Sequence, residues 1–226
     1  MAVVVGATGG IGRALLNEIG VTGQLGPVIG LSRQSQPAID LTHEPSIEAC
    51  ARHMASLDTP LRLVILATGI LHDATMRPER SLRDLTPEQL ARALALNTIG
   101  PALVLKHVAP LLPRDGRSVI AALSARVGSI GDNHVGGWYG YRASKAALNQ
   151  VIRTAAIELK RTRPQAICVA LHPGTVDTPL SAPFSKAGLN TRTPDVAAHD
   201  LLSVIAGLTP EKSGAFLDYR GQAIPW

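Results

Sequence analysis

Short apolar runs alternate with longer segments of helical periodicity along the whole chain. Runs such as AVVV, RLVILA, RSVIAAL and AICVAL are continuously apolar, which is typical of strands buried on both faces of a parallel sheet. We expect strands near residues 2–6, 27–31, 62–67, 117–123, 165–171 and 214–218, and helices near 10–20, 45–57, 87–111, 138–162 and 194–207. This order predicts an α/β fold: a single domain over residues 1–226 with a doubly wound parallel sheet of about six or seven strands and helices on both faces.

Two threonines mark the starts of predicted helices. Thr86 and Thr193 each precede a proline, and a threonine cap followed by proline at the first helical position is typical of a helix start. Pro101 falls inside the helix expected at 87–111. Because proline has no amide hydrogen to donate, we expect it to bend that helix.

A glycine-rich turn joins the first strand to the first helix in the segment AVVVGATGGIGRALL. Glycines let the backbone turn sharply and approach a ligand, and the helix start offers free N–H groups to a phosphate. The spacing fits both GxxxGxG and GxxGxxG, and a simple connecting turn would be weakened by so many glycines. The sequence therefore predicts a dinucleotide phosphate site at Gly6, Thr8, Gly9, Gly10, Ile11 and Gly12.

A tyrosine and a lysine lie four residues apart in the segment YGYRASKAALN, at Tyr141 and Lys145. Residues at this spacing share one face of a helix. A fixed positive charge beside a tyrosine favours the phenolate, so we expect a lowered tyrosine pKa and a group that transfers protons near neutral pH. Taken alone the pair is weak evidence, because tyrosine and lysine at this spacing are common on solvated helices.

Composition limits the other classes of protein. The chain has 226 residues, 46% of them hydrophobic, enough for one core. The net charge of +5 comes from scattered arginines, and aromatic residues make up only 3%, which argues against a nucleic-acid partner. The apolar runs are short and no signal peptide is apparent, so we expect no membrane partner and a cytoplasmic location. Cys50 and Cys168 give no metal spacing, so we expect no metal site.

These motifs, in this order, resemble the short-chain dehydrogenase/reductase family along essentially the whole chain. The glycine turn resembles that family's TGxxxGxG, the segment ATG at 67–69 lies where the family has NNAG, and Asn97 fits its helical asparagine. Tyr141 and Lys145 fit YxxxK, and HPGTVDT at 172–178 resembles the motif after the fifth strand. The segments LSARVGSIGDN, GGWYGYRASKAALN and FLDYRGQAIPW resemble the C-factor group, which is similar to sniffer-type carbonyl reductases.

The resemblance implies hydride transfer between a nicotinamide and a carbonyl or alcohol, supported by a proton relay. Tyr141 would protonate the oxygen, Lys145 would lower the tyrosine pKa and bind the ribose, and Asn97 would hold a water. A serine hydroxyl would polarise the carbonyl. Val176 would offer its backbone, and Thr178 its hydroxyl, to the carboxamide.

The end of the second strand indicates the choice of cofactor. It carries Ser32 and Arg33, with Arg13 just beyond the glycine turn, and no carboxylate that would select NAD(H). A hydroxyl and a guanidinium suit a 2′-phosphate, so we expect NADP(H). Asp40 and Leu41 resemble the family's adenine contact. The remaining contacts implied by the resemblance are Ala67, Thr68, Gly69, Pro173, Gly174, Val176 and Thr178, together with Asn97, Tyr141 and Lys145.

Three positions depart from the family pattern. Val5 replaces the threonine that opens the glycine motif, and LAT at 66–68 replaces Asn-Asn-Ala. Where relatives read SSxxG with the second serine catalytic, this chain has Ser124 followed by Ala125. We assign the catalytic hydroxyl to Ser124, and Ser129 is the weaker candidate.

Two further function classes stay open. One is an NADP(H)-binding sensor or signalling protein of the C-factor type with little turnover. The other is an epimerase or dehydratase, against which the short interval from Gly174 to Thr193 argues. For the reductase, we expect a small or moderately apolar carbonyl substrate beneath loop 175–193, with Trp138 and His134 on the other side. In similar proteins helices equivalent to 87–111 and 138–162 pair across a twofold axis, so we expect a homodimer or homotetramer.

Overall fold

The computed structural model describes residues 1–23, 25–184 and 191–226, and these form one six-stranded parallel sheet. The strands are β1 (Ala2–Val5), β2 (Val28–Leu31), β3 (Leu63–Leu66), β4 (Ser118–Leu123), β5 (Ala166–His172) and β6 (Phe216–Asp218), in the order β2-β1-β3-β4-β5-β6. The predicted α/β fold with a doubly wound parallel sheet is confirmed.

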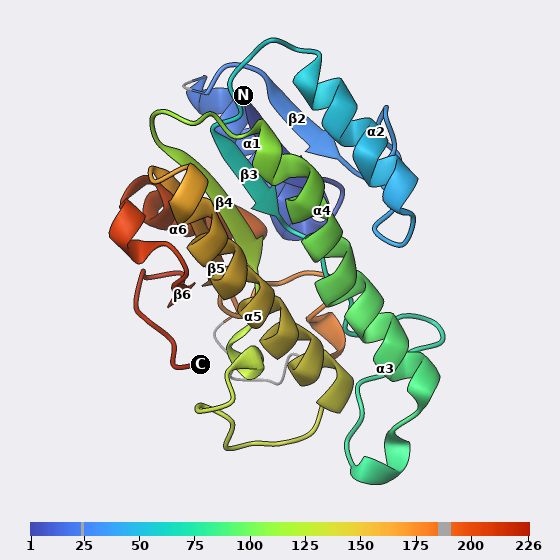
Figure 1. Cartoon of the computed structure of the whole chain (residues 1–226). Coiled ribbons are helices and arrows are strands. Elements are labelled where there is room, and N and C mark those ends of the chain that lie inside the picture. Colours follow the sequence, from blue (N-terminus) through green and yellow to red (C-terminus); the bar gives the residue numbers. More distant parts are fainter. Residues whose placement is uncertain (24, 185–190) are drawn as a thin grey trace.

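Helices cover both faces of the sheet (Figure 1). One face packs against α2 (Glu44–Ala55), α4 (Gly100–Val108) and α5 (Tyr139–Thr162), and the other against α1 (Gly10–Thr22) and α6 (Pro194–Ala206). Successive residues of a strand point to opposite faces of the sheet. Val3 therefore packs in the core beneath α2, α4 and α5, and Val4 packs in the core beneath α1 and α6. Two buried faces explain why the strands are continuously apolar.

The two predicted threonine caps are present. The Thr86 hydroxyl accepts the Gln89 N–H at 3.3 Å before α3 (Pro87–Leu94), and the Thr193 hydroxyl accepts the Val196 N–H at 3.4 Å before α6. The remaining short helical turns are Leu82–Asp84, Ala109–Leu111, Arg126–Gly128, Ala182–Phe184 and Pro210–Lys212.

The long helix that contains Pro101 is interrupted by a π-helical segment, Ala95–Ile99, between α3 and α4. Pro101 has no N–H to donate to the carbonyl of Asn97, four residues earlier, so the regular pattern cannot continue through this point. The irregular segment places Asn97 in the interior, where it is fully buried.

The helical stretch Pro87–Leu111 is also long and apolar enough to cross a membrane by length and composition, with a mean hydropathy of 1.2. This stretch is not one of the short apolar runs on which the expectation of no membrane partner rests. Here Val104, Leu105 and Val108 pack into the sheet's hydrophobic core. Core helices of this kind account for the same composition without a membrane.

The chain order places the predicted binding loops at one edge of the sheet. From β1 the chain builds outward to β2, and then returns to the other side of β1 with β3, so the direction of winding reverses between β1 and β3. Ligands of such sheets bind beyond the carboxyl ends of the strands at this reversal. The loops after β1, β3, β4 and β5 all leave the sheet at that edge.

Candidate active site

The turn after β1 needs glycine for steric reasons. Gly6 has φ +89°, and a Cβ there would lie 2.7 Å from the carbonyl oxygen of Ala67. A Cβ on Gly12 would lie closer than 3.0 Å to the carbonyl oxygen of Gly6, and one on Gly10 would lie 2.8 Å from the Thr178 methyl group. The turn is therefore compressed between the β3 loop and the segment after β5, with the start of α1 directly behind it.

Two cavities lie at this edge, and together they gather most of the predicted site residues. The first has a volume of about 620 Å³ and is lined by Gly6, Thr8, Gly9, Ser32, Arg33, Asp40, Leu41, Ala67, Thr68 and Gly69. The second has a volume of about 460 Å³ and is lined by Ile11, Ser124, Tyr141, Pro173, Gly174, Val176 and Thr178. Both volumes suit small molecules, and the glycine turn borders both cavities.

The first cavity has a polar end beyond β2. Ser32 is nearly buried and its hydroxyl accepts the Gln34 N–H at 3.0 Å, whereas Arg33 is exposed. Asp40 accepts the hydroxyl of Thr42 at 2.7 Å, and this hydrogen bond does most to hold the pKa of Asp40 below its usual range. Arg13, which the sequence analysis placed near the 2′-phosphate of NADP(H), donates to the Thr8 carbonyl at 3.3 Å.

Tyr141 and Lys145 lie on the first turns of α5, and both are buried. The Lys145 Nζ donates to the Leu123 carbonyl at 2.8 Å and is 5.9 Å from the centroid of the Tyr141 ring. Burial raises the pKa of Tyr141 to about 12 and lowers that of Lys145 to about 8.

The expected lowering of the tyrosine pKa is therefore wrong for this structure. Burial of the Tyr141 hydroxyl raises its pKa, and the Lys145 ammonium, which is itself desolvated, donates to a backbone carbonyl. The Tyr141 side chain is a protonated phenol at neutral pH. In this state it can donate a proton to a developing alkoxide, the direction needed for carbonyl reduction.

Asn97 ties the loop after β3 to α5. Its Oδ1 accepts the Ile70 N–H at 2.7 Å, and its Nδ2 donates to the Ile70 carbonyl at 2.9 Å and to the Ser144 hydroxyl at 3.0 Å. A Cβ on Gly69 would lie 3.3 Å from both the Asn97 Oδ1 and the Lys145 Nζ. Asn97, Gly69 and Lys145 are thus neighbours, although no sequence spacing connects them.

Ser124 follows β4 and borders the second cavity, but its hydroxyl points to a neighbour on α5. The Ser124 Oγ donates to the Asn149 Oδ1 at 2.6 Å, in a fully buried hydrogen bond. Ala125, also at the cavity wall, carries no hydroxyl. The buried Ser129, the weaker candidate, donates to the Pro225 carbonyl at 2.5 Å.

Aromatic side chains close one side of the second cavity. Trp138 contacts Tyr141 and Phe184 edge to face, with centroids 6.3 and 5.0 Å apart. His72 contacts Phe184 at 5.4 Å, and its Nε2 is 3.0 Å from the Pro179 carbonyl oxygen. His72 thereby joins the loop after β3 to the segment after β5.

The prediction for the substrate loop is met only in part. Trp138 lines the cavity, whereas His134 is exposed and is not among the described residues that do so. Residues 185–190 of the expected loop lie outside the described part of the chain.

Sequence reasoning missed two residues that organise this site, His72 and Asn149. Each makes its contacts with residues far away in the chain: His72 with Pro179 and Asn149 with Ser124. Asn149 lies four residues after Lys145 on α5, so helical spacing could have drawn attention to it. No comparable signal marks His72.

The two cysteines take no part in the site. Cys50 and Cys168 are buried, and burial raises the pKa of each thiol, that of Cys168 to about 12. Among residues 1–23, 25–184 and 191–226, no group of three His, Cys, Asp or Glu side chains could hold a metal ion.

The doubly wound sheet, the compressed glycine turn and the Tyr141–Lys145 pair are typical of dinucleotide-binding oxidoreductases. The sequence family described as enoyl-(acyl carrier protein) reductase matches residues 27–203. A 1-hydroxy-2-glutathionyl-2-methyl-3-butene dehydrogenase of Rhodococcus sp. (strain AD45) is 32% identical over 191 residues, 84% of this chain and 80% of that protein. The chain belongs to the short-chain dehydrogenase/reductase family. The oxidoreductases of this family act on alcohol and carbonyl groups. The predicted family and the predicted class of enzyme are therefore confirmed.

Other relatives agree with the predicted group. The C-signal protein of Myxococcus xanthus is 37% identical over 147 residues, 65% of this chain and 84% of that protein. The NADPH-bound carbonyl reductase from chicken fatty liver has a TM-score of 0.85 at 25% identity, covering 100% of this chain and 98% of that one. The carbonyl reductase Sniffer of D. melanogaster has the same fold, with a TM-score of 0.84 at 21% identity over 100% of this chain and 98% of that one.

Proposed function

We propose that this protein is an NADP(H)-dependent carbonyl reductase, reversible as an alcohol dehydrogenase. The observation that carries the proposal is Tyr141, a buried and protonated phenol on the wall of a cavity of about 460 Å³, next to Lys145. A proton donor at the wall of a small-molecule cavity suits reduction of a carbonyl to an alcohol. Support also comes from the similarity to an NADPH-bound carbonyl reductase.

Each residue of the predicted relay has a role in this proposal. NADPH supplies the hydride when bound. Tyr141 would donate its proton to the carbonyl oxygen, and Lys145, on the first turns of α5, would bind the cofactor ribose. The buried Asn97 fixes the loop after β3 through Ile70, and it would also hold the relay water. Ser124 polarises the carbonyl, which requires that its hydroxyl leave Asn149.

The first cavity fits the cofactor's phosphates and adenosine. A Cβ at Gly6 or Gly12 would collide with the backbone of Ala67 or of Gly6, so glycine is what lets this turn pass so close to the start of α1. The cavity continues from the turn to Ser32 and Arg33. A guanidinium at that position suits the 2′-phosphate of NADP(H). A putative short-chain dehydrogenase/reductase from Burkholderia multivorans with bound NADP is 28% identical with a TM-score of 0.78, over 100% of this chain and 98% of that one.

NADPH oxidation with a panel of aldehydes and ketones tests this function. Tyr141→Phe removes the transferable proton but keeps the ring, so we expect the reduction rate to fall about a hundredfold or more while NADPH binding survives. Tyr139→Phe is the matched control, because Tyr139 begins the same helix and should affect the rate little. Equal losses in the two variants would mean that the proton donor has been misplaced.

A second candidate is an NADP(H)-binding sensor or signalling protein with little turnover. The buried Ser124–Asn149 hydrogen bond, the missing hydroxyl at Ala125 and the similarity to a C-signal protein favour it. Such a protein would bind NADPH normally and oxidise it with no carbonyl compound in the panel. The two candidates share a cofactor and an expected cytoplasmic location, so turnover separates them.

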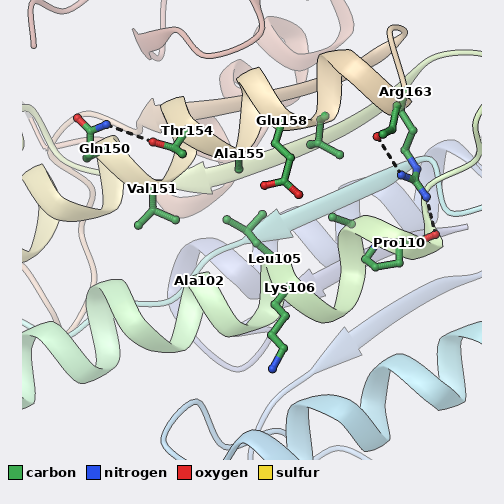
Figure 2. A pocket seen from close by; sticks show the side chains of 13 residues that line it. Ala102, Leu105, Lys106, Pro110, Gln150, Val151, Thr154, Ala155, Glu158 and Arg163 are labelled. Atoms are coloured by element: carbon green, nitrogen blue, oxygen red, sulfur yellow. Dashed lines mark hydrogen bonds between the residues drawn. The ribbon is translucent and has the colours of Figure 1, made fainter.

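We also propose that the protein forms a homodimer or homotetramer through α4 and α5. A groove of about 580 Å³ lies between these helices, and its lining combines apolar side chains such as Leu105, Val151 and Ala155 with charged ones such as Lys106 and Glu158 (Figure 2). Ile99 and Ile157, on the same helical layer, are about half exposed, at 54% and 49%. A groove with apolar side chains that two helices share suits a twofold contact, in which one surface meets its own copy.

A further inference from the structure

The helix that carries Tyr141 begins directly after a strained backbone turn. Trp138, the residue before α5, has φ +53°, a left-handed conformation that is unfavourable for a residue with a large side chain. The Trp138 side chain forms no capping hydrogen bond with the helix. Because helix starts leave backbone N–H groups free, contacts from outside α5 are needed to hold this turn in place.

Glu79, in the loop after β3, makes two such contacts. Its backbone carbonyl accepts the Trp138 N–H at 2.5 Å, and its Oε2 accepts the Gly140 N–H at 3.1 Å. The residue is buried, with 2% of its surface exposed. The Glu79 carboxyl group therefore caps α5 from a different element of the fold, in the way that a side chain at the helix start usually does.

The carboxyl group of Glu79 is closely packed against the helix start. A Cβ on Gly140 would lie 2.8 Å from the Glu79 Oε1, closer than side-chain contacts normally are. Oε1 is buried and has no hydrogen-bond partner among the residues that the structure describes. Because a buried oxygen without a partner lowers stability, the carboxyl group contributes position at the start of α5 more than it contributes stability.

Two side chains of the candidate active site depend on this turn. Trp138 and Tyr141 both line the cavity of about 460 Å³, and their rings contact each other edge to face. Arg142 also holds the turn, by donating to the carbonyls of Gly136 and Gly137. A shift of the helix start would move the Tyr141 hydroxyl relative to a substrate in the cavity, and a misplacement of about 1 Å can slow a reaction about a hundredfold.

We propose that Glu79 is a positioning residue for the proposed reduction, in which it fixes the first turn of α5 and thereby the place of the Tyr141 hydroxyl. Glu79 is not among the described residues that line the cavity, so it acts through Tyr141. Asn97 ties the loop after β3 to α5 further along the helix, at Ser144. This inference rests on the proposed reductase function and adds a residue to it.

Three variants separate the hydrogen bond of Glu79 from the bulk of its side chain. Glu79→Leu removes the acceptor, and Glu79→Gln keeps an acceptor oxygen. Glu88→Leu is the matched control, because Glu88 is exposed on α3. With a carbonyl compound that the unmodified protein reduces, we expect Glu79→Leu to lower kcat about tenfold or more with the Kd for NADPH unchanged. Glu79→Gln and Glu88→Leu should keep a near-normal kcat.

A double variant tests whether Glu79 acts through the tyrosine. In Tyr141→Phe protein, the side chain whose position Glu79 sets no longer transfers a proton. Adding Glu79→Leu to that variant should therefore lower kcat little further, because the effects of residues that act as a unit do not add. Full additivity of the two substitutions would overturn the inference.

Amide hydrogen exchange at Gly140, followed by NMR, examines the same contact without turnover. We expect this amide to exchange about tenfold faster or more in Glu79→Leu and at nearly the native rate in Glu79→Gln. Should Glu79→Leu fail to fold, as judged by circular dichroism, Glu79→Met provides the apolar variant.

The outcomes distinguish this inference from the proposed function. A normal kcat in Glu79→Leu, or equal losses in Glu79→Leu and Glu79→Gln, would overturn the positioning role. Absence of NADPH oxidation by any carbonyl compound would overturn the proposed function. In that case the exchange comparison still decides whether Glu79 holds the helix start, because it does not depend on turnover.

Discussion

At the scale of single residues, burial decides the chemistry of the site more than sequence spacing does. Tyr141 and Lys145 share a helix face as their spacing predicts, yet desolvation moves their pKa values toward the neutral forms of both groups. The sequence identifies which groups are close together. It does not give the loss of water around them, which depends on α5 packing over the ends of β4 and β5.

Arg33 provides a test of cofactor choice at this scale. If its exposed guanidinium binds the 2′-phosphate, Arg33→Ala should weaken NADPH binding by about 1.5–3 kcal/mol and hardly change NADH binding. Fluorescence titration with both cofactors measures the difference. Arg52→Ala is the control, because Arg52 is an exposed arginine of α2 paired with Glu48. A similar loss of both cofactors in Arg33→Ala would contradict the assignment.

Ser124 is the member of the relay whose geometry must change for catalysis. If its hydroxyl leaves Asn149 to polarise the carbonyl, Ser124→Ala should lower the turnover rate about a hundredfold with NADPH affinity preserved. Ala125→Ser should then add little. Near-normal turnover in Ser124→Ala, with a sharp increase in Ala125→Ser, would show a native site that lacks its hydroxyl and would favour the sensor.

At the scale of elements, local signals predicted the helices and strands well, and packing explains the exceptions. The threonine caps are where the sequence places them. The helix at 87–111 is instead divided by a π segment, because Pro101 and the buried Asn97 have requirements that a regular helix cannot meet. Pro101 predicted that the helix would be irregular at this point. That the irregularity is a π segment depends on the contacts of Asn97 with the loop after β3.

Helix α1 contains two glycines, Gly12 and Gly20, that differ in their surroundings. Substituting each of them distinguishes the steric need for glycine from the effect of glycine's backbone flexibility on stability. A Cβ on Gly12 would collide with the Gly6 carbonyl, but a Cβ on Gly20 would meet nothing within 4 Å. We expect Gly20→Ala to raise the free energy of unfolding by about 0.5–1 kcal/mol. Gly12→Ala should lower it by about 1–3 kcal/mol and abolish NADPH binding.

Urea unfolding and NADPH titration of both glycine variants provide the measurements. A stable Gly12→Ala protein that binds NADPH normally would show that the turn can open. It would also remove the steric argument for the phosphate site.

At the scale of the whole molecule, the groove between α4 and α5 predicts self-association. Val151→Glu places a charge in the groove, and burial of that charge at a twofold contact would be costly. We expect this variant to be smaller than the unmodified protein in light scattering after size exclusion. Val21→Glu, on α1 and 88% exposed, should keep the native assembly. Equal masses for all three proteins would place any interface elsewhere.

The sequence by itself determined the α/β class, the glycine turn, the Tyr141–Lys145 pair and the family, because these depend on local periodicity and on motifs of fixed spacing. Only the tertiary structure decided which side chains are desolvated and which are already hydrogen-bonded. The Ser124 hydroxyl donates to Asn149, His72 holds the segment after β5, and Glu79 caps the start of α5. These relations join residues far apart in the chain, so their direction and burial arise only when the strands and helices pack together.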